Sequence, residues 1–197
     1  MDKNLQRDLI CFLYFDLNRL RYIIGDEIFE YDIQANIHQF LKYRLKNKNT
    51  IVQREREGKV DIVIVSKNDE GIVHNYTFIE VKSFIKKSEI FDYNKIHDDI
   101  KKLSDKISER DKISDGYLIV AVKQSHFLNT DKVFKSLLKA LSGKKKSYEF
   151  EYGKEREKIK AGIIRSFITY YSGKSDNEGH KSEVHKAQIR LFMFHLK

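Results

Sequence analysis

The sequence contains no proline and only one cysteine, Cys11. The absence of proline excludes a proline-rich linker between domains, and no low-complexity tract or internal repeat is visible either. A single cysteine cannot form a disulfide within the chain, which fits a reducing compartment. Because Cys11 falls within an apolar helical pattern, we expect it to be a small core residue and not a reactive thiol.

Long apolar segments are missing as well. No window approaches the roughly eighteen consecutive apolar residues that cross a membrane. The N-terminus also lacks a basic segment followed by an apolar stretch and a cleavage site of small residues. We therefore expect a soluble, cytoplasmic protein with no membrane partner. With 197 residues and 41% hydrophobic content, the chain is sufficient for one domain with a proper core.

Positive charge is in excess, and it is unevenly spread. The formal net charge is +9. Residues 1–130 hold 22 Lys and Arg against 21 Asp and Glu, whereas residues 131–197 hold 16 against 8. A basic excess favours polyanionic partners, nucleic acid before acidic membrane surfaces, although a solvated lysine-rich surface has the same composition. Lys144, Lys145 and Lys146 are candidate phosphate contacts for a nucleic acid, or ordinary loop charges.

Two stretches near the N-terminus have the period of an amphipathic helix. Residues 3–22 repeat apolar side chains at spacings of three and four, which predicts a helix that Gly25 ends. A second helix is predicted over about residues 28–45. The apolar face of the first helix is expected to be core, with a dimer interface as the alternative.

Strand-like segments dominate the rest of the chain. Three runs joined by short turns predict a meander, and a helix and a short apolar strand that is covered on both faces come next. Another helix precedes a β-rich segment whose middle run is ambiguous with helix. The order helix, three strands, helix, strand predicts an α/β fold with a mixed sheet flanked by helices. The predicted strands are residues 50–56, 60–65, 76–84, 117–122, 147–152, 162–171 and 186–196, and the later helices are residues 94–110 and 130–141.

Two strands of the predicted meander carry charge where apolar residues are expected. Asp61 lies at the head of one strand, and Glu80 and Lys82 lie inside the next. Because side chains alternate along a strand, Phe78, Glu80 and Lys82 would share one face. Charged groups on a covered sheet are costly unless they are paired or bind a cation. The pattern therefore predicts either a structural ion pair or a catalytic site.

The chemistry of these three residues favours metal-assisted hydrolysis. Antiparallel pairing would bring the carboxylate of Asp61 beside that of Glu80, and adjacent carboxylates raise a pKa unless a cation neutralises them. Oxygen ligands suit a hard ion such as Mg²⁺ or Mn²⁺, which accepts phosphate oxygens from a substrate. Lys82 would reach the same face and could hold or help deprotonate the attacking water. Metal and lysine together would stabilise the charge that develops on a phosphodiester.

With these residues, the chain resembles the PD-(D/E)XK phosphodiesterases, also called the restriction endonuclease-like superfamily. The resemblance depends on Asp61, on Glu80-Val81-Lys82 and on the order of elements across about residues 26–124. It implies a restriction endonuclease-like sheet flanked by helices. A valine, and not the proline of the motif's name, precedes Asp61.

The resemblance also implies a role for each residue. Asp61 and Glu80 would bind divalent metal together with the backbone carbonyl of Val81, and Lys82 would assist the water. Many members carry a glutamate on the core helix that precedes the strands. Glu30, on the predicted second helix, looks like that residue.

We expect a single nuclease domain over residues 1–197. It would consist of a core of about residues 26–141, an N-terminal helix in residues 1–25 and a β-rich C-terminal extension in residues 143–197. The expected activity is Mg²⁺-dependent or Mn²⁺-dependent cleavage of DNA by an endonuclease of restriction, repair or phage-defence type. Three alternatives stay open: an RNA-cleaving enzyme with the same site, a nucleic-acid-binding module of the same fold that does not cut, and a structural subunit. As assemblies, a homodimer and a larger defence or repair complex are both compatible with the sequence.

Overall fold

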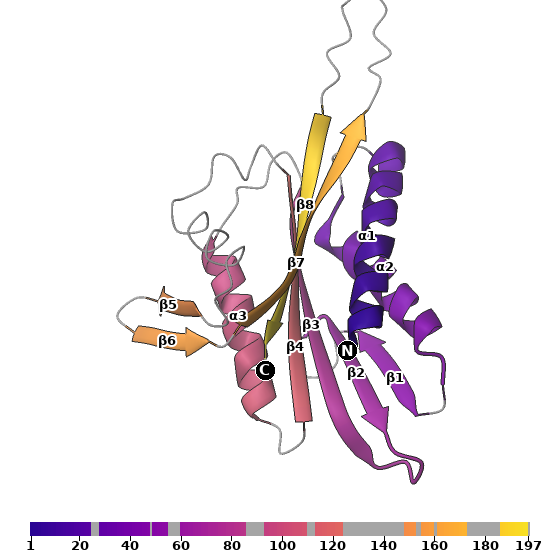
Figure 1. Cartoon of the computed structure of the whole chain (residues 1–197), viewed down its shortest axis with the longest axis vertical. Coiled ribbons are helices and arrows are strands. Elements are labelled where there is room, and N and C mark those ends of the chain that lie inside the picture. Colours follow the sequence, from indigo (N-terminus) through magenta and orange to yellow (C-terminus); the bar gives the residue numbers. More distant parts are fainter. Residues whose placement is uncertain are drawn as a thin grey trace, which may run out of the picture.

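The computed structural model contains one main sheet with helices packed against it (Figure 1). The predicted helix over residues 130–141 and the candidate phosphate contacts Lys144, Lys145 and Lys146 lie outside the described residues. The structure describes residues 1–24, 28–47, 49–54, 60–85, 93–109, 113–123, 148–152, 155–159, 161–172 and 186–196. The elements are α1 (Lys3–Ile24), α2 (Glu30–Arg44), β1 (Thr50–Arg54), β2 (Ile62–Lys67), β3 (Val73–Phe84), α3 (Tyr93–Ser108), β4 (Ile113–Lys123), β5 (Tyr148–Tyr152), β6 (Glu155–Ile159), β7 (Ala161–Ser172) and β8 (Lys186–Leu196).

Six strands form the main sheet in the order β1-β2-β3-β4-β8-β7. β3 and β4 run parallel, and every other neighbouring pair in this sheet is antiparallel. β5 and β6 pair separately as an antiparallel ribbon. The predicted α/β class, with a mixed sheet flanked by helices, is confirmed.

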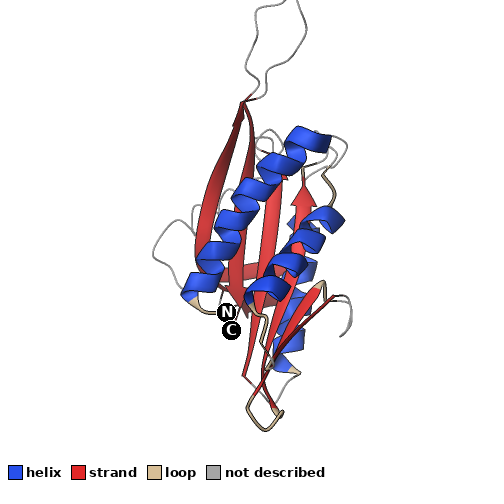
Figure 2. Ribbon diagram, turned by 90° about the vertical axis from the view of Figure 1, so that its right-hand side faces the viewer, coloured by secondary structure: helices blue, strands red, loops and turns tan. Residues whose placement is uncertain are grey.

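Helices cover both faces of the sheet, α1 and α2 on one side and α3 on the other (Figures 1 and 2). Side chains of β4 alternate between the two layers because successive residues of a strand point in opposite directions. Leu118 and Val120 pack in the core under α3, whereas Tyr117 and Ile119 pack in the core under α1 and α2. The prediction that this strand is covered on both faces is confirmed.

The first helix buries its apolar stripe and does not leave it exposed for a partner. Leu9, Leu13 and Leu17 have no solvent-exposed area. The prediction for Cys11 is wrong, because its side chain is exposed. Cys11 lies two positions after Leu9, which places it roughly 200° around the helix from that buried residue.

The connection from β3 to β4 runs through α3, because parallel neighbours need a crossover and not a tight turn. Gly116 on β4 permits a close approach of the helix. A Cβ atom at this position would lie only 2.9 Å from Cδ1 of Ile107 on α3. The crossover thereby holds α3 directly against the two parallel strands.

Two features of the sheet differ from the sequence prediction. β3 begins at Val73, earlier than the predicted residue 76, because a turn closed by Asn68 and Gly71 brings the strand back at once. Gly71 has φ 80°, a left-handed conformation that glycine adopts without strain. The ambiguous run at 162–171 is strand β7, and β8 pairs directly with β4. Residues 143–197, expected to form an extension, therefore supply two strands of the main sheet.

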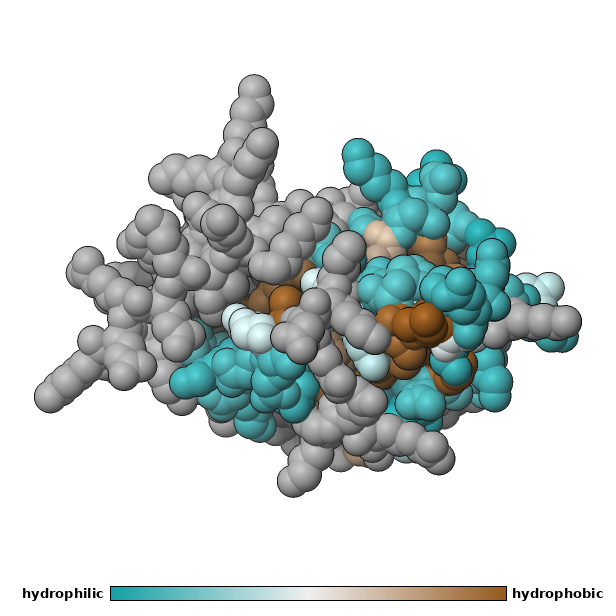
Figure 3. Space-filling view, turned by 90° about the horizontal axis from the view of Figure 1, so that it is seen from below, coloured by the Kyte–Doolittle hydropathy of each residue, from teal (hydrophilic) through white to brown (hydrophobic). Residues whose placement is uncertain are grey.

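The described surface seen in Figure 3 is mainly hydrophilic, with hydrophobic residues visible between hydrophilic ones. In the described part of the chain, no helix combines the length and the apolarity needed to cross a bilayer.

Candidate active site

β3 positions two of the predicted site residues by simple alternation. Phe78 packs in the core under α3, and Glu80 and Lys82 follow at spacings of two on the same face. Glu80 is almost completely buried, at 2% exposure, and the side chain of Lys82 is 19% exposed. Both residues lie in the C-terminal half of β3, near the carboxyl end of the parallel pair. This is the end of parallel strands at which α/β proteins usually place their sites.

Asp61 immediately precedes β2 and lies beside Glu80. The antiparallel register pairs Ile62 with Ile79, so the residue before β2 reaches the position opposite Glu80. The amide N–H of Val81 donates to Oδ2 of Asp61 at 2.7 Å. This hydrogen bond fixes the Asp61 carboxylate against the β3 backbone.

The two carboxyl groups perturb each other strongly. Burial raises the pKa of Asp61, and the hydrogen bond from Val81 and the charge of Lys102 oppose that rise. Burial raises the pKa of Glu80 to about 8, and the charge of Asp61 adds to the rise. Two buried carboxyl groups side by side disfavour each other's ionisation, and a cation bound between them would offset that repulsion.

α3 supplies a counter-charge for Glu80. Nζ of Lys102 lies 2.5 Å from Oε1 of Glu80. The side chain of Glu80 is 3% exposed and that of Lys102 is 31% exposed, so the ion pair extends from the buried carboxylate toward solvent. Lys102 lowers the pKa of Glu80 but does not overcome the effects of burial and Asp61.

Lys82 is held between two carboxylates on different helices. Its Nζ lies 3.2 Å from Oδ2 of Asp99 on α3 and 3.3 Å from Oε2 of Glu30 on α2. Burial by itself would lower the pKa of Lys82, but the charges of Asp99 and Glu30 raise it above its ordinary value. The side chain is therefore a fixed ammonium at neutral pH.

Glu30 is the first residue of α2, and its side chain turns toward the carboxyl end of β3. Oε2 of Glu30 accepts a hydrogen bond from the amide N–H of Ser83 at 3.3 Å. The same oxygen forms the ion pair with Lys82. The side chain is 34% exposed. The structure thus brings Glu30 into the same cluster as Asp61, Glu80 and Lys82.

Divalent metal is the group that the resemblance implies, and the donor atoms are compatible with it. Among the residues that the structure describes, no three His, Cys, Asp or Glu side chains converge as a ready-made metal cage. Mg²⁺ does not need one, since it is usually bound by one or two carboxylates, waters and substrate phosphates. Asp61 and Glu80 supply two such carboxylates. At Val81 the recorded contact is made by the amide N–H and not by the carbonyl oxygen.

Sequence reasoning missed Asp99 and Lys102 as members of the site. Both lie on α3, three residues apart, beside the buried Ile100 and Leu103. Charged residues that border the apolar stripe of a helix face the edge of the buried layer, which is the signal that could have drawn attention to them. The partners of Asp99 and Lys102 depend on the position of α3 relative to β3. Helical periodicity does not predict that position.

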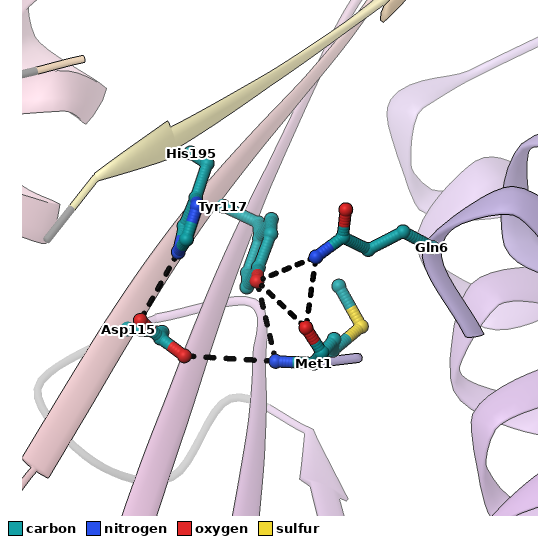
Figure 4. Close-up of polar contacts among 5 residues, drawn as sticks. All are labelled: Met1, Gln6, Asp115, Tyr117 and His195. Atoms are coloured by element: carbon teal, nitrogen blue, oxygen red, sulfur yellow. Dashed lines mark hydrogen bonds and ion pairs between the residues drawn. The ribbon is translucent and has the colours of Figure 1, made fainter. Parts of the chain in front are cut away.

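A second polar cluster joins α1 to β4 and β8 (Figure 4). The amino group of Met1 lies 3.6 Å from Oδ2 of Asp115 and donates to the Tyr117 hydroxyl oxygen at 3.2 Å. Nε2 of Gln6 donates to the same hydroxyl at 3.1 Å. Nε2 of His195 lies 3.0 Å from Oδ1 of Asp115, and the imidazole ring of His195 stacks on the ring of Tyr117.

This second cluster is distinct from the motif residues. The register places Asp115 opposite Thr77, five residues before Lys82 on β3 and so about 16 Å away along the strand. Asp115 also borders a cavity of about 360 Å³. Burial and the charge of Asp115 raise the pKa of Tyr117, so the phenol stays neutral. The cluster satisfies its own charges and fastens α1 to the sheet.

The chain was compared with known proteins. It matches none of the protein-family models, and the search of curated proteins found no match.

Proposed function

We propose that this protein is a metal-dependent nuclease that hydrolyses phosphodiester bonds in DNA, with a restriction endonuclease-like fold. One observation carries the proposal: Asp61 lies opposite Glu80 where β2 and β3 pair, and Lys82 follows Glu80 on the same face of β3, although Asp61 and Lys82 are 21 positions apart in sequence. The order helix, three strands, helix and strand, on which the resemblance to the PD-(D/E)XK phosphodiesterases depends, supports it.

Asp61 and Glu80 would hold Mg²⁺ or Mn²⁺ through their carboxylate oxygens. When bound, the ion would supply positive charge at the scissile phosphate and lower the pKa of a bound water. The hydrogen bond from Val81 keeps the Asp61 carboxylate oriented toward Glu80. Glu80, whose pKa is raised to about 8, would release its proton as the ion binds.

Lys82 would act as a hydrogen-bond donor and a positive charge. Its ammonium lies within 3.3 Å of both Asp99 and Glu30, and these charges raise its pKa. A lysine held in its charged form is poorly suited to accept a proton, but it can orient a water molecule and stabilise a developing oxyanion. Glu30 and Asp99 would position that ammonium.

The test is cleavage of plasmid DNA with Mg²⁺ or Mn²⁺ by the parent protein and by Asp61→Ala and Lys82→Ala. We expect both variants to lose cutting while they retain their folded circular dichroism spectrum. Lys95→Ala is the matched control, because Lys95 is an exposed lysine of α3 and the ion pairs of Lys82 and Glu80 are made with Glu30, Asp99 and Lys102. Unchanged cutting by Asp61→Ala or Lys82→Ala would contradict the proposed site.

A parallel digest of single-stranded DNA and of RNA distinguishes the alternatives. Cleavage of RNA alone would assign the same site to an RNA-cleaving enzyme. Salt-sensitive DNA binding without cleavage under any divalent ion would indicate a binding module. Absence of both binding and cleavage would favour a structural subunit.

A further inference from the structure

The ion pair between Lys102 and Glu80 places a positively charged side chain at the proposed metal site. Lys102 approaches Glu80 from α3, whereas Asp61 approaches it from the start of β2. Asp61 lies opposite Glu80 in the register of β2 and β3. The ammonium of Lys102 thus lies against one of the two carboxyl groups that form the proposed metal site.

An ammonium and a divalent ion cannot both lie against the same carboxylate oxygen without strong repulsion. Lys102 has a route away from Glu80, because its side chain is 31% exposed. A displaced Lys102 ammonium can therefore move toward solvent.

We propose that Lys102 holds the cation position at Glu80 in the metal-free protein and is displaced when a divalent ion binds. Lys102 is then a built-in competitor that sets the divalent-ion affinity of the site. The inference rests on the proposed metal site formed by Asp61 and Glu80.

The experiment measures divalent-ion binding and not cleavage. Chelator-treated, dialysed protein is titrated with Mn²⁺ and with Mg²⁺ at pH 8.5 and constant ionic strength, by calorimetry and by thermal melting. The variants are Lys102→Met, which removes the charge, and Lys102→Arg, which keeps it. Lys101→Met is the matched control, since Lys101 is the adjacent lysine of α3. Lys102→Gln replaces Lys102→Met if the latter does not fold.

We expect Lys102→Met to bind Mn²⁺ roughly tenfold more tightly than the parent, which corresponds to about 1.4 kcal/mol. Lys102→Arg and Lys101→Met should bind with the affinity of the parent. An affinity of Lys102→Met equal to or weaker than that of the parent would overturn the inference. Absence of binding by all the proteins would overturn it together with the metal site.

The outcomes separate this inference from the proposed function. DNA cleavage by a parent whose affinity is unaffected by Lys102→Met would leave the nuclease proposal standing and remove the competitor role. Tighter Mn²⁺ binding by Lys102→Met, with no cleavage of any nucleic acid by the parent, would support cation exchange and refute the nuclease.

Discussion

Charged residues of the site are arranged in opposed pairs. On β3, Glu80 and Lys82 are two positions apart. Glu80 pairs with Lys102 of α3, and Lys82 pairs with Asp99 of the same helix. Buried charges are tolerated when each has a counter-charge and costly when one partner is removed. Single substitutions in this set should therefore affect both stability and function, and matched controls are needed to separate the two.

A substitution of Asp99 tests most directly whether the partners of Lys82 position its ammonium. Asp99→Asn removes the nearest negative charge from Lys82 while it keeps the size of the side chain. If the nuclease proposal holds, we expect kcat for DNA cleavage to fall by about 10- to 100-fold with little change in KM, as is usual when the partner of a site residue is removed. Asp98→Asn, at an exposed neighbouring position, is the control. A change in KM alone would argue against positioning.

Glu80 predicts a pH dependence of stability in the metal-free protein. Its pKa of about 8 in the folded state exceeds the ordinary value of 4.5, so the folded state binds more protons than the unfolded state between these values. Stability contributed by this proton is present below pH 4.5 and is lost as the pH rises toward 8. We expect Glu80→Gln, which has no proton to lose, to gain about 3 kcal/mol relative to the parent between pH 5.5 and pH 8.5.

Urea unfolding in chelator at pH 5.5 and pH 8.5 measures this difference. The gain should appear at the higher pH. A difference between parent and variant that does not change with pH would show that Glu80 ionises normally.

At the scale of the element, α3 is the part of the fold that completes the site. It lies over the parallel pair β3 and β4, and Gly116 sets how closely it approaches. The apolar pattern of this segment predicted a helix and its buried face, and Ile96, Ile100 and Leu103 are indeed buried. The contacts of Asp99 and Lys102 were not predictable, because they depend on the tertiary position of the helix.

Gly116→Ala tests this close approach. The added Cβ would meet Cδ1 of Ile107 at 2.9 Å, so we expect a loss of about 1–3 kcal/mol in the free energy of unfolding. Ile107→Val removes that methyl group and should make the substitution at Gly116 less costly. Denaturant unfolding of the two single variants and the double variant measures the coupling. Additive losses would mean that the contact with Ile107 does not limit the approach.

The strand patterns of the sequence predicted pairing between neighbouring strands but not between distant ones. The meander of β1, β2 and β3 was predicted because its partners are neighbours in sequence and their turns contain recognisable residues. The placement of β8 beside β4 was not, since it joins segments more than 60 residues apart. Periodicity reports which face of a strand is buried, but it does not report which distant strand becomes its neighbour.

At the scale of the whole molecule, the net charge of +9 predicts how the proposed DNA binding would depend on salt. Affinity that comes from lysine and arginine contacts to phosphates falls steeply as salt rises, because counterions are released on binding. We expect DNA affinity to fall by a factor of about 100 or more between roughly 50 and 200 mM salt. Fluorescence anisotropy with the Asp61→Ala variant in chelator measures binding without cleavage. Affinity that is insensitive to salt would argue against a phosphate-dominated interface.

The position of β8 between β4 and β7 has a consequence for how the protein is made. β8 is the partner of one edge of β4, and the ribosome synthesises residues 186–196 more than 60 residues after β4, so that edge lacks its final partner until then. An open edge of a hydrophobic strand is a template for aggregation. Nascent or truncated chains that lack β8 should therefore depend on chaperones, even though every residue of the proposed catalytic cluster has already been translated.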